Sequence, residues 1–442
     1  MKIVYVVQSY LPDSVAGTEM YTDALANYIK NQGHEVFVVL PNFNWSPIKN
    51  ASYTYNNIPV ISYDEPSQSS RDIILGVQKT EGLANFTETI KKLNPDIVHF
   101  QMISAGAGIS LHHLKEVKKL GCKTILTMHL SHYTCLTNNL LQNNKELCDG
   151  IIQKHKCSVC YIHNKHISLP LARMISNISN LATAGFKQSA KLYNVPLLGV
   201  GLHVIKKLEQ LKTITSHIDK ICVITDWYKT ILLRNNVPEE KIALIRQGVI
   251  TSKSKNSDSL DDSDKRLKLI FIGRISALKG LHLLLQALAK ISPDQYILNV
   301  YGLFEKTDPY FEKWHTFSTK HRMSVSFKGA INHHEINQAL TKHDFLCLPS
   351  LFSEMSPLVI QEAFEAGIPV IGSNVPGITE EIKNEVNGFI FSFNQWKELQ
   401  AIIKNMINHP EVAEKLKENV KSPRSFDFIG QETLDIYNNL LK

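Results

Sequence analysis

The chain has 442 residues, of which 43% are hydrophobic and 20% charged, and it has a net charge of +7 at neutral pH. This composition is ordinary for a globular enzyme, and the length suggests two or three domains. The apolar residues form no uninterrupted run of about 18, which excludes a helix that crosses a membrane. The positive charge is concentrated in residues 110–250, which hold 19 Lys/Arg and 8 Asp/Glu.

The chain begins with a short apolar run, MKIVYVVQSYLPD, that Pro12 ends. A signal peptide needs a longer apolar stretch and a small-residue cleavage site, so this run is interpreted as a first core strand. We therefore expect a cytoplasmic protein. Its seven cysteines are then expected to be thiols or metal ligands rather than disulfides.

Short apolar runs alternate with helical patterns through the first half of the chain. The pattern in residues 17–31 places Tyr21, Leu25 and Ile29 on one helical face, and Gly33 follows. Strands are predicted at residues 2–8, 35–40, 97–101, 123–128 and 220–225. Strands that are apolar throughout and alternate with helices indicate a parallel, doubly wound sheet.

A polar segment, SKSKNSDSLDDSDK, separates the two halves, and its composition is typical of a linker. The alternation then restarts, with strands predicted at residues 267–272, 296–301, 325–328, 345–349 and 369–373. Helices are predicted at residues 280–291, 334–341, 357–366, 379–383 and 429–441. The fold class is therefore α/β, with two Rossmann-like domains at residues 1–250 and 266–425, a linker at 251–265 and a C-terminal helix within 426–442.

A cationic loop follows the strand LKLIFI. Gly273 permits close backbone approach at the end of the strand, Arg274 offers a planar donor fork, and Lys279 a point charge before Gly280. Two cations at the carboxyl end of a strand suit a diphosphate. A surface loop with two solvated charges explains the segment equally well.

The segment PSLFSEMSPLVIQEAFEAGIPVIG has the pattern strand, loop, helix, strand. Pro357 suits the first position of the helix, where its missing N–H costs nothing. The free N–H groups of Leu358 and Val359 would then form an anion site at the positive end of the helix. Glu354 before the helix and Glu362 within it could accept hydrogen bonds from hydroxyls, which fits a sugar and a ribose on either side of a diphosphate.

These motifs resemble the retaining GT-B glycosyltransferases of the large family four, also known as glycosyl transferases group one. The signature of that family is Glu, seven residues, then Glu, followed by Ala and a G-x-P-V strand, which here is Glu354, Glu362, Ala363 and GIPVIG. The resemblance extends to FIGRISALKG, SNVPGITEEI, NGFIF and SYLPDSVAGTEMYTDALANYIKNQGHEV. It spans most of the chain outside residues 131–215.

The resemblance implies a GT-B architecture, in which two Rossmann-like domains face a cleft and the second binds a nucleotide sugar. Arg274 and Lys279 would neutralise the diphosphate leaving group, with Gly273 close to it. Glu362 would hold the ribose hydroxyls and Glu354 the transferred sugar. The family needs no catalytic divalent metal. It favours UDP as the nucleotide, and assembly of polysaccharides or lipid-linked glycans is a common role.

Two residues of the first half match the family, but in each case the neighbouring residue differs from the one that is usual in the family. Gly17 would approach the donor phosphates, but Ala16 stands where the family has a second Gly. His129, at the end of the strand TILTM, matches the family's His near the sugar, and Leu130 stands where an Asp is frequent. Without the resemblance, His129 would be interpreted as a histidine of the core with its hydrogen bonds satisfied.

Four cysteines, Cys135, Cys148, Cys157 and Cys160, fall within 26 residues and form an insert at about residues 131–165. The final Cys-x2-Cys pair could grip one ion that the other two complete, as in a structural zinc site. An iron–sulfur cluster is an alternative, and so are free thiols. Cys122, Cys222 and Cys347 lie in strand-like runs and are interpreted as buried apolar residues.

The residues named above allow three functions. These are a glycosyltransferase, a non-catalytic sugar-nucleotide-binding protein, and a metal-centred redox or nucleic-acid-binding protein. The third leaves Glu354 and Glu362 unexplained, so we expect no nucleic-acid partner. The acceptor is expected to be a saccharide or a lipid-linked molecule. The basic segment 166–215 could rest on the inner membrane face, or pack on the core as an ordinary insert, and its cations are Arg173, Lys187, Lys191, Lys206, Lys207 and Lys212.

Overall fold

The computed structural model describes residues 1–43, 52–66, 70–74, 76, 78–104, 106, 108–182, 197, 199–250 and 264–442. The chain forms two compact units. The N-terminal unit consists of Met1–Arg246 together with Phe426–Lys442, and the C-terminal unit of Gln247–Ser425. No helix within the described residues combines the length and apolar character that crossing a membrane requires.

The N-terminal unit is built on an eight-stranded sheet with the order β10-β9-β6-β5-β1-β2-β4-β3, in which every pair is parallel except β3 with β4. The strands are β1 (Lys2–Val6), β2 (Glu35–Phe43), β3 (Ser52–Tyr55), β4 (Ile58–Glu65), β5 (Ile97–Phe100), β6 (Lys123–Met128), β9 (Lys220–Val223) and β10 (Ile242–Leu244). Strand order reverses between β1 and β5. At such a switch point the loops after the strands diverge and leave room for a ligand.

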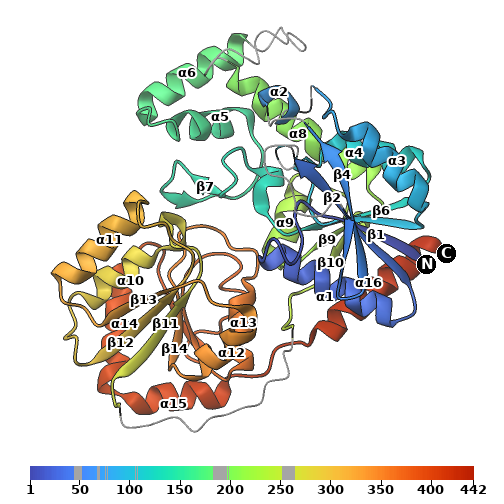
Figure 1. Cartoon of the computed structure of the whole chain (residues 1–442). Coiled ribbons are helices and arrows are strands. Elements are labelled where there is room, and N and C mark those ends of the chain that lie inside the picture. The colour runs from blue at the N-terminus through green and yellow to red at the C-terminus, as the bar shows by residue number, and fades with distance from the viewer. Residues whose placement is uncertain are drawn as a thin grey trace. The chain divides into compact units, whose positions relative to one another are not determined.

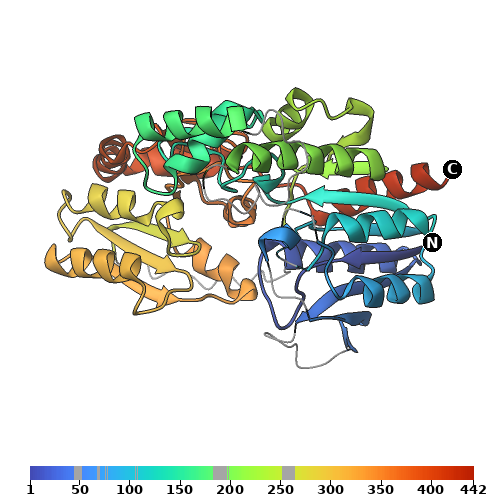
Figure 2. The same cartoon turned by 90° about the horizontal axis from the view of Figure 1, so that it is seen from above.

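Helices cover both faces of this sheet (Figures 1 and 2). They are α1 (Gly17–Asn31), α2 (Arg71–Ile74), α3 (Leu83–Leu93), α4 (Leu111–Lys119), α8 (Val200–His217), α9 (Asp226–Arg234) and α16 (Phe426–Leu441). The bounds of α1 and β6 agree with the sequence prediction. The pair β3–β4 and the strand β10 were not predicted, because each is short or follows a turn with no strong apolar pattern.

The C-terminal helix α16 returns to the N-terminal unit and packs beside α1. Tyr437 buries its hydroxyl 2.6 Å from Nδ1 of His99 and 3.1 Å from the hydroxyl of Tyr5. The second ring nitrogen of His99 lies 2.7 Å from Oγ1 of Thr127. Because buried polar groups are costly without partners, this chain of hydrogen bonds fixes how α16 docks on the sheet.

An insert follows β6 in the same unit. It contains the 3-10 helix η2 (Ser131–Thr134), a hairpin of β7 (Leu141–Gln142) and β8 (Glu146–Leu147), α5 (Lys154–His163) and α6 (Leu169–Ala182). A small apolar cluster of Val159, Ile162, Ala172 and Val200 joins α5 and α6 to α8. The insert therefore has its own core next to the main one.

The C-terminal unit has a fully parallel six-stranded sheet with the order β13-β12-β11-β14-β15-β16. The strands are β11 (Leu267–Ile272), β12 (Tyr296–Tyr301), β13 (Val325–Gly329), β14 (Phe345–Leu348), β15 (Val370–Ser373) and β16 (Gly388–Phe391). All but β16 were predicted within one residue. Here the strand order reverses between β11 and β14.

Helices also cover both faces of the second sheet (Figure 1). They are α10 (Leu281–Leu288), α11 (Pro309–Lys320), α12 (His333–Thr341), α13 (Leu358–Glu365), α14 (Trp396–Asn408) and α15 (Pro410–Asn419). The helix predicted at residues 379–383 is wrong: residues 376–381 form turns, because the N–H of Glu381 bonds to the carbonyl of Ile378, three residues back. The prediction of two doubly wound α/β sheets is confirmed.

Candidate functional site

The switch point of the C-terminal unit brings together two of the charged residues that the sequence singled out. Lys279 ends η4 (Ala277–Lys279) in the loop after β11, and Glu354 lies in the loop after β14. Their charged groups form an ion pair, with Nζ of Lys279 2.8 Å from Oε1 of Glu354. Ligands of doubly wound sheets bind at the carboxyl ends of the strands beside such a reversal, so the pair stands where a ligand is expected.

The carboxylate of Glu354 is buried and held from several sides. Its side chain is only 8% exposed, and Ser350 Oγ donates a second hydrogen bond to the same oxygen over 2.7 Å. The backbone N–H of Glu354 donates to the carbonyl of Pro376. A Cβ on Gly377 would lie 2.0 Å from the carbonyl oxygen of Glu354, so the two loops can approach only with glycine there. Glu354 is therefore a preorganised acceptor.

Gly280 lets the loop after β11 press against the loop after β14. Its φ is +70°, and a Cβ there would lie 1.8 Å from the carbonyl oxygen of Pro349. A side chain would therefore push apart the two loops that hold Lys279 and Glu354. Gly273 was predicted to permit close approach at the end of β11, and its φ of 158° is extended backbone in which a Cβ would meet only ordinary contacts. Of these two glycines, only Gly280 stands at a position where a side chain would clash.

The N-terminus of α13 follows Glu354 closely in the chain and carries backbone N–H groups that make no intrahelical hydrogen bond. Pro357 is the N-cap, with φ −59° and ψ 124°, so the helix starts one residue later than predicted, at Leu358. No side chain caps this end, and the first intrahelical bond is the one from Ile360 N–H to the Pro357 carbonyl. The N–H groups of Leu358 and Val359 precede that bond, as required of an anion site at a helix N-terminus.

Glu362 has a side-chain partner that the sequence did not suggest. Its Oε1 lies 3.0 Å from Nε2 of His333, the first residue of α12, and the carboxylate is 14% exposed. The only signal for His333 was its position just after β13, at the same edge of the sheet as the other loops. Glu362 is thus a partly buried acceptor whose partner comes from a neighbouring helix.

Arg274 and Glu381 play contrasting parts in the same unit. Arg274 is exposed, and within the described residues its guanidinium has no hydrogen bond or ion pair. Glu381 was not predicted as a site residue, yet its two oxygens accept hydrogen bonds from Ser356 and Gln361, both over 2.8 Å. Glu381 therefore ties the turn at 376–381 to the start of α13, and Arg274 remains available to a ligand.

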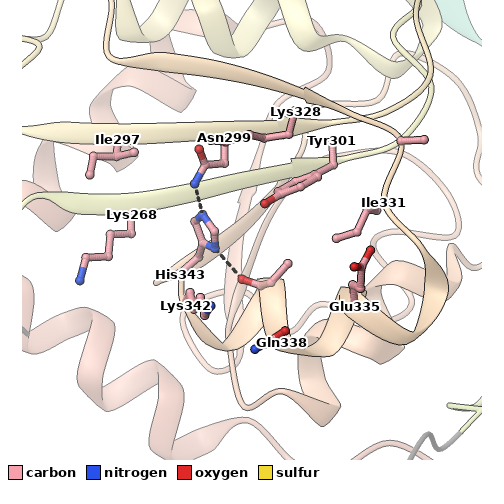
Figure 3. A pocket seen from close by; sticks show the side chains of 12 residues that line it. Lys268, Ile297, Asn299, Tyr301, Lys328, Ile331, Glu335, Gln338, Lys342 and His343 are labelled. Carbon is pink, nitrogen blue, oxygen red and sulfur yellow. Dashed lines mark hydrogen bonds between the residues drawn. The ribbon is translucent and has the colours of Figure 1, made fainter. Parts of the chain in front are cut away.

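A hollow of about 480 Å³ lies between β12 and α12 of this unit (Figure 3). His343 crosses it, with Nε2 2.8 Å from Nδ2 of Asn299 and Nδ1 2.7 Å from the carbonyl of Ala339. Burial lowers the pKa of His343. Glu354 and Glu362 do not line the hollow, so the hollow and the paired carboxylates are different places.

His129 closes β6 in the N-terminal unit, as predicted, and it is almost fully buried. Its Nε2 lies 2.8 Å from Oε1 of Gln101, and its ring meets Tyr21 edge to face at 4.8 Å. Burial lowers the pKa of His129 to about 3, so the ring is neutral at physiological pH. The amide nitrogen of Gln101 is buried, and it finds no partner within the described residues. Gln101, which follows β5 at the switch point, was missed from the sequence.

Gly17 is the first residue of α1 and is exposed. The side chain that organises this end of α1 is Glu19, which is buried and accepts a hydrogen bond of 2.6 Å from Ser9 and one of 3.3 Å from Ser14. Both serines belong to the loop after β1. Glu19, which was not predicted from the sequence, therefore fixes this loop. Gly17 lies two residues before Glu19, with its backbone exposed to solvent.

The four cysteines of the insert belong to η2, β8 and α5. Cys135 follows η2, Cys148 follows β8, and Cys157 and Cys160 lie on α5. All four are thiols, and within the described parts of the chain no group of three or more His, Cys, Asp or Glu is placed so that it could hold a metal ion. The metal site thus stays a prediction. Cys122, Cys222 and Cys347 are buried thiols.

Two family models match the chain. The model for glycosyl transferases group 1 matches residues 252–422, and the model for Glycosyltransferase Family 4 matches residues 15–154. The first match contains the loops after β11 and β14 together with α13, and the second contains α1 and His129. Together they cover most of the chain.

Curated relatives are distant. An uncharacterized glycosyltransferase of Methanocaldococcus jannaschii, MJ1607, is 26% identical over 46% of this chain and 55% of its own length. The putative colanic acid biosynthesis glycosyltransferase WcaL of Salmonella typhimurium is 24% identical over 41% of this chain and 46% of its own. The chain spans about half the length of the curated relatives that it matches.

Solved structures agree with the fold over nearly the whole chain. The Anabaena protein Alr3699/HepE, in complex with UDP-glucose, superposes with a TM-score of 0.66 at 17% identity and covers 99% of this chain and 100% of its own. At that identity the likeness shows the fold alone, which is that of the GT-B glycosyltransferases. With its two family matches and this fold, the chain belongs to the GT-B glycosyltransferases of family 4 and group 1.

Proposed function

We propose that this protein transfers a sugar from a nucleotide diphosphate sugar, with UDP as the nucleotide, to a hydroxyl group of an acceptor, with retention at the anomeric carbon. The observation that supports this most directly is the Lys279–Glu354 ion pair at the switch point between β11 and β14. A cation and a buried carboxylate beside a helix N-terminus match the charges and hydroxyls of a sugar diphosphate.

The diphosphate would be held by Lys279, Arg274 and the N–H groups of Leu358 and Val359. Negative charge grows on the departing diphosphate as the bond to the sugar breaks, and fixed donors lower the barrier because they need no reorganisation. Arg274, exposed in the chain itself, would close onto the phosphate oxygens. Lys279 is held in place by Glu354, so its charge is oriented before the donor arrives.

The ribose would be held by Glu362, since a carboxylate accepts hydrogen bonds from two vicinal hydroxyls. His333 occupies this carboxylate in the ligand-free chain. We infer that ribose hydroxyls replace or share that partner, so Glu362 is never left buried without one. Glu354 would contact the transferred sugar, with Ser350 retaining its orientation.

His129, Gln101 and Gly17 would serve the sugar and the phosphates from the N-terminal unit. His129 is neutral, so it would act as a hydrogen-bonding group and not as a charged one. The buried amide nitrogen of Gln101 is a donor that a hydroxyl of the sugar or acceptor could use. Gly17 would bring the N-terminus of α1 to the phosphates.

The acceptor is proposed to be a saccharide or lipid-linked molecule in polysaccharide or glycolipid assembly. The likeness to a putative colanic acid glycosyltransferase supports this class. We place the protein in the cytoplasm, because all seven cysteines are thiols as in a reducing compartment. Contact at the inner membrane face is a separate part of the proposal. A non-catalytic sugar-nucleotide-binding protein is the alternative, and no observation favours it. No divalent metal is assigned to the reaction.

The four cysteines support a separate proposal, a structural metal site of the zinc class. Backbone N–H groups already point at two of the sulfurs, from Asn143 to Cys160 over 3.3 Å and from Gln153 to Cys157 over 3.4 Å. Such donors stabilise metal-bound thiolates. Since these residues are not placed as a metal site in the thiol form, we propose that a bound ion gathers the sulfurs of Cys135 and Cys148 to those of Cys157 and Cys160.

The experiment is a turnover assay of the full chain with UDP-glucose and other nucleotide sugars, in which release of UDP is measured with and without acceptor sugars. The anomeric form of the first product, read by NMR, tests retention. Glu354→Gln is the matched inactive control, because it keeps the shape of the side chain. Binding of UDP without any release from any donor would favour the non-catalytic alternative.

A further inference from the structure

Helix α6 of the insert buries two small polar side chains and exposes four large apolar ones. The face that packs on α5 and α8 buries Ser176 and Ser179, each fully, together with Ala172. Ser176 Oγ lies 3.2 Å from Nδ1 of His155, and Ser179 Oγ accepts from the N–H of Gly201 over 3.0 Å. Two small polar residues therefore take part in the inner contact of the helix, beside the apolar contact that Ala172 makes with α5 and α8.

The outer face of α6 is apolar. Leu171, Met174, Ile178 and Leu181 are 43%, 53%, 47% and 78% exposed, and their spacing of three, four and three residues places them on one stripe. The other large apolar side chains that are exposed in the described chain are scattered singly over many elements. Scattered residues need no explanation, whereas a continuous apolar stripe marks a contact surface.

The surroundings of this stripe are cationic. Residues 151–182 contain Lys154, Lys156, Lys165 and Arg173 and have no Asp or Glu. Lys165 and Arg173 are exposed, and Lys154 lies against α6, donating to the carbonyl of Asn180 over 3.3 Å. Lys156 is paired with Asp149. An anionic surface would complement this charge, whereas a second copy of the same region would repel it.

The size of the stripe also bears on its occupant. Four side chains along one helix are few compared with the roughly 20–30 residues that each partner contributes to a stable protein interface. A helix of 14 residues is about 21 Å long, too short to cross a bilayer but long enough to lie in its surface. Figure 1 shows α6 at the outer edge of the insert, with α5 between it and β7, and the four apolar side chains are exposed among the residues that the structure describes.

We propose that the outer face of α6, formed by Leu171, Met174, Ile178 and Leu181, docks the protein on an anionic lipid surface. The apolar side chains would enter the boundary between headgroups and acyl chains, and Lys165 and Arg173 would meet lipid phosphates. This rests on the proposed function, because it places the enzyme where a lipid-linked acceptor resides.

The basic residues named from the sequence take different roles. Lys207 on α8 is buried, donates to the carbonyl of His132 over 2.9 Å, and has a pKa that burial lowers to about 8. Lys206 pairs with Glu209. The apolar residues Val200, Leu202 and Val204 of α8 are buried, so α8 packs on the core. Lys187 and Lys191 lie outside the described residues.

The test is co-sedimentation of the full chain with vesicles of phosphatidylcholine alone or mixed with phosphatidylglycerol, at low and high salt. We expect binding to the anionic vesicles only, weakened by salt. The triple variant Met174→Ser, Ile178→Ser, Leu181→Ser should bind about tenfold more weakly or worse. Leu303→Ser with Phe428→Ser, which removes two apolar side chains exposed elsewhere, should bind as the parent does. Lys165→Glu with Arg173→Glu should also lose binding.

The outcomes separate this proposal from the proposed function. UDP release from UDP-glucose in solution, measured on the same preparations, should be equal in the parent and the triple variant. If the parent released no UDP but still bound the anionic vesicles, the proposed glycosyltransferase activity would be contradicted and the lipid contact would stand. Absence of vesicle binding, or equal binding by the triple variant, would overturn the docking surface. A dimer of the parent that the triple variant abolishes would show that the stripe joins two copies, which would also overturn it.

Discussion

The two units pair their buried polar groups in opposite ways. In the N-terminal unit they are neutral: burial lowers the pKa values of His99, His113 and His129 to about 3. In the C-terminal unit they include one pair of opposite charges, Lys279 with Glu354, and a second carboxylate, that of Glu362, which faces the ring of His333. Both units have a parallel sheet with a switch point, so the fold does not impose this difference.

The difference indicates which unit meets the charged part of a ligand. A buried neutral histidine is stable without a counter-ion and offers hydrogen bonds only. A buried ion pair contributes little net stability, because desolvation offsets the attraction. Its two members are nevertheless ready to exchange partners with a charged ligand. The C-terminal unit is therefore the one suited to a diphosphate.

Acidification should harm the N-terminal unit most. The histidines His99, His113 and His129 have pKa values of about 3 in the fold and about 6.5 when unfolded, so the unfolded state binds more protons below pH 6.5. Stability is full above that pH and is lost as pH falls towards 3. Between pH 7.5 and 5.5 the three together should cost this unit about 4 kcal/mol. Calorimetric unfolding across this range measures it.

The C-terminal unit supplies the internal control. In this unit burial lowers the pKa of two histidines, that of His282 to about 4 and that of His343. The C-terminal unit should therefore lose less stability than the N-terminal unit over the same pH range. UDP added to the sample should raise only the transition of the C-terminal unit and so identify it. If both transitions fell equally, the contrast between the units would not stand.

Lys279→Ala should lower turnover about 100- to 1000-fold, because it removes a fixed charge from the leaving diphosphate and leaves Glu354 buried without its cation. Single-turnover kinetics with UDP-glucose should show a larger loss in the chemical step than in donor binding. Arg274→Ala should give a smaller loss of the same kind, since no buried partner is stranded. Equal losses in binding and chemistry would mean that the two cations only anchor the donor.

Glu362→Ala should weaken donor binding by about 1.5–3 kcal/mol, the usual worth of hydrogen bonds to a charged group. Calorimetric titration with UDP measures this without turnover. Glu365→Ala is the matched control, because Glu365 lies on the same helix but is exposed. His333→Ala should leave UDP binding intact or improve it, since it frees the carboxylate. Unchanged affinity of a folded Glu362→Ala variant would show that the ribose binds elsewhere.

Local chemistry explains what could be predicted from the sequence. The strands β6, β11 and β12 have uniform apolar runs ending at a charge, glycine or histidine, so their bounds and the loops that follow were clear. The positions of Lys279 and Glu354 at the ends of two strands were therefore predictable. Their direct pairing was not, because it depends on the strand order that makes β11 and β14 neighbours.

Other features depend on contacts between distant residues. His333 is one of two adjacent histidines at the start of α12, and only the packing of α12 against α13 selects it for Glu362. Tyr437 gives no sign in the sequence that it reaches His99 and Tyr5. The stripe on α6 was hidden because LPLARMI alone does not show which face of the helix packs inward.

Substitutions in the cysteine insert are expected to have the smallest effect on the donor site. They should change the N-terminal unit and leave the C-terminal unit as it is. Purified under reducing conditions without chelator, the parent should contain about one zinc-class ion per chain by mass spectrometry. Cys157→Ser with Cys160→Ser should remove it and lower the unfolding temperature of the N-terminal unit, while UDP binding stays unchanged. Cys122→Ser, a buried thiol outside the insert, is the control and should retain the metal. Four thiolates around one divalent ion leave a net charge of −2, and Lys156 and Lys207 lie near enough to affect, or be affected by, the charge of these sulfurs. A folded parent without metal would show instead that the lysines serve an ordinary thiol cluster.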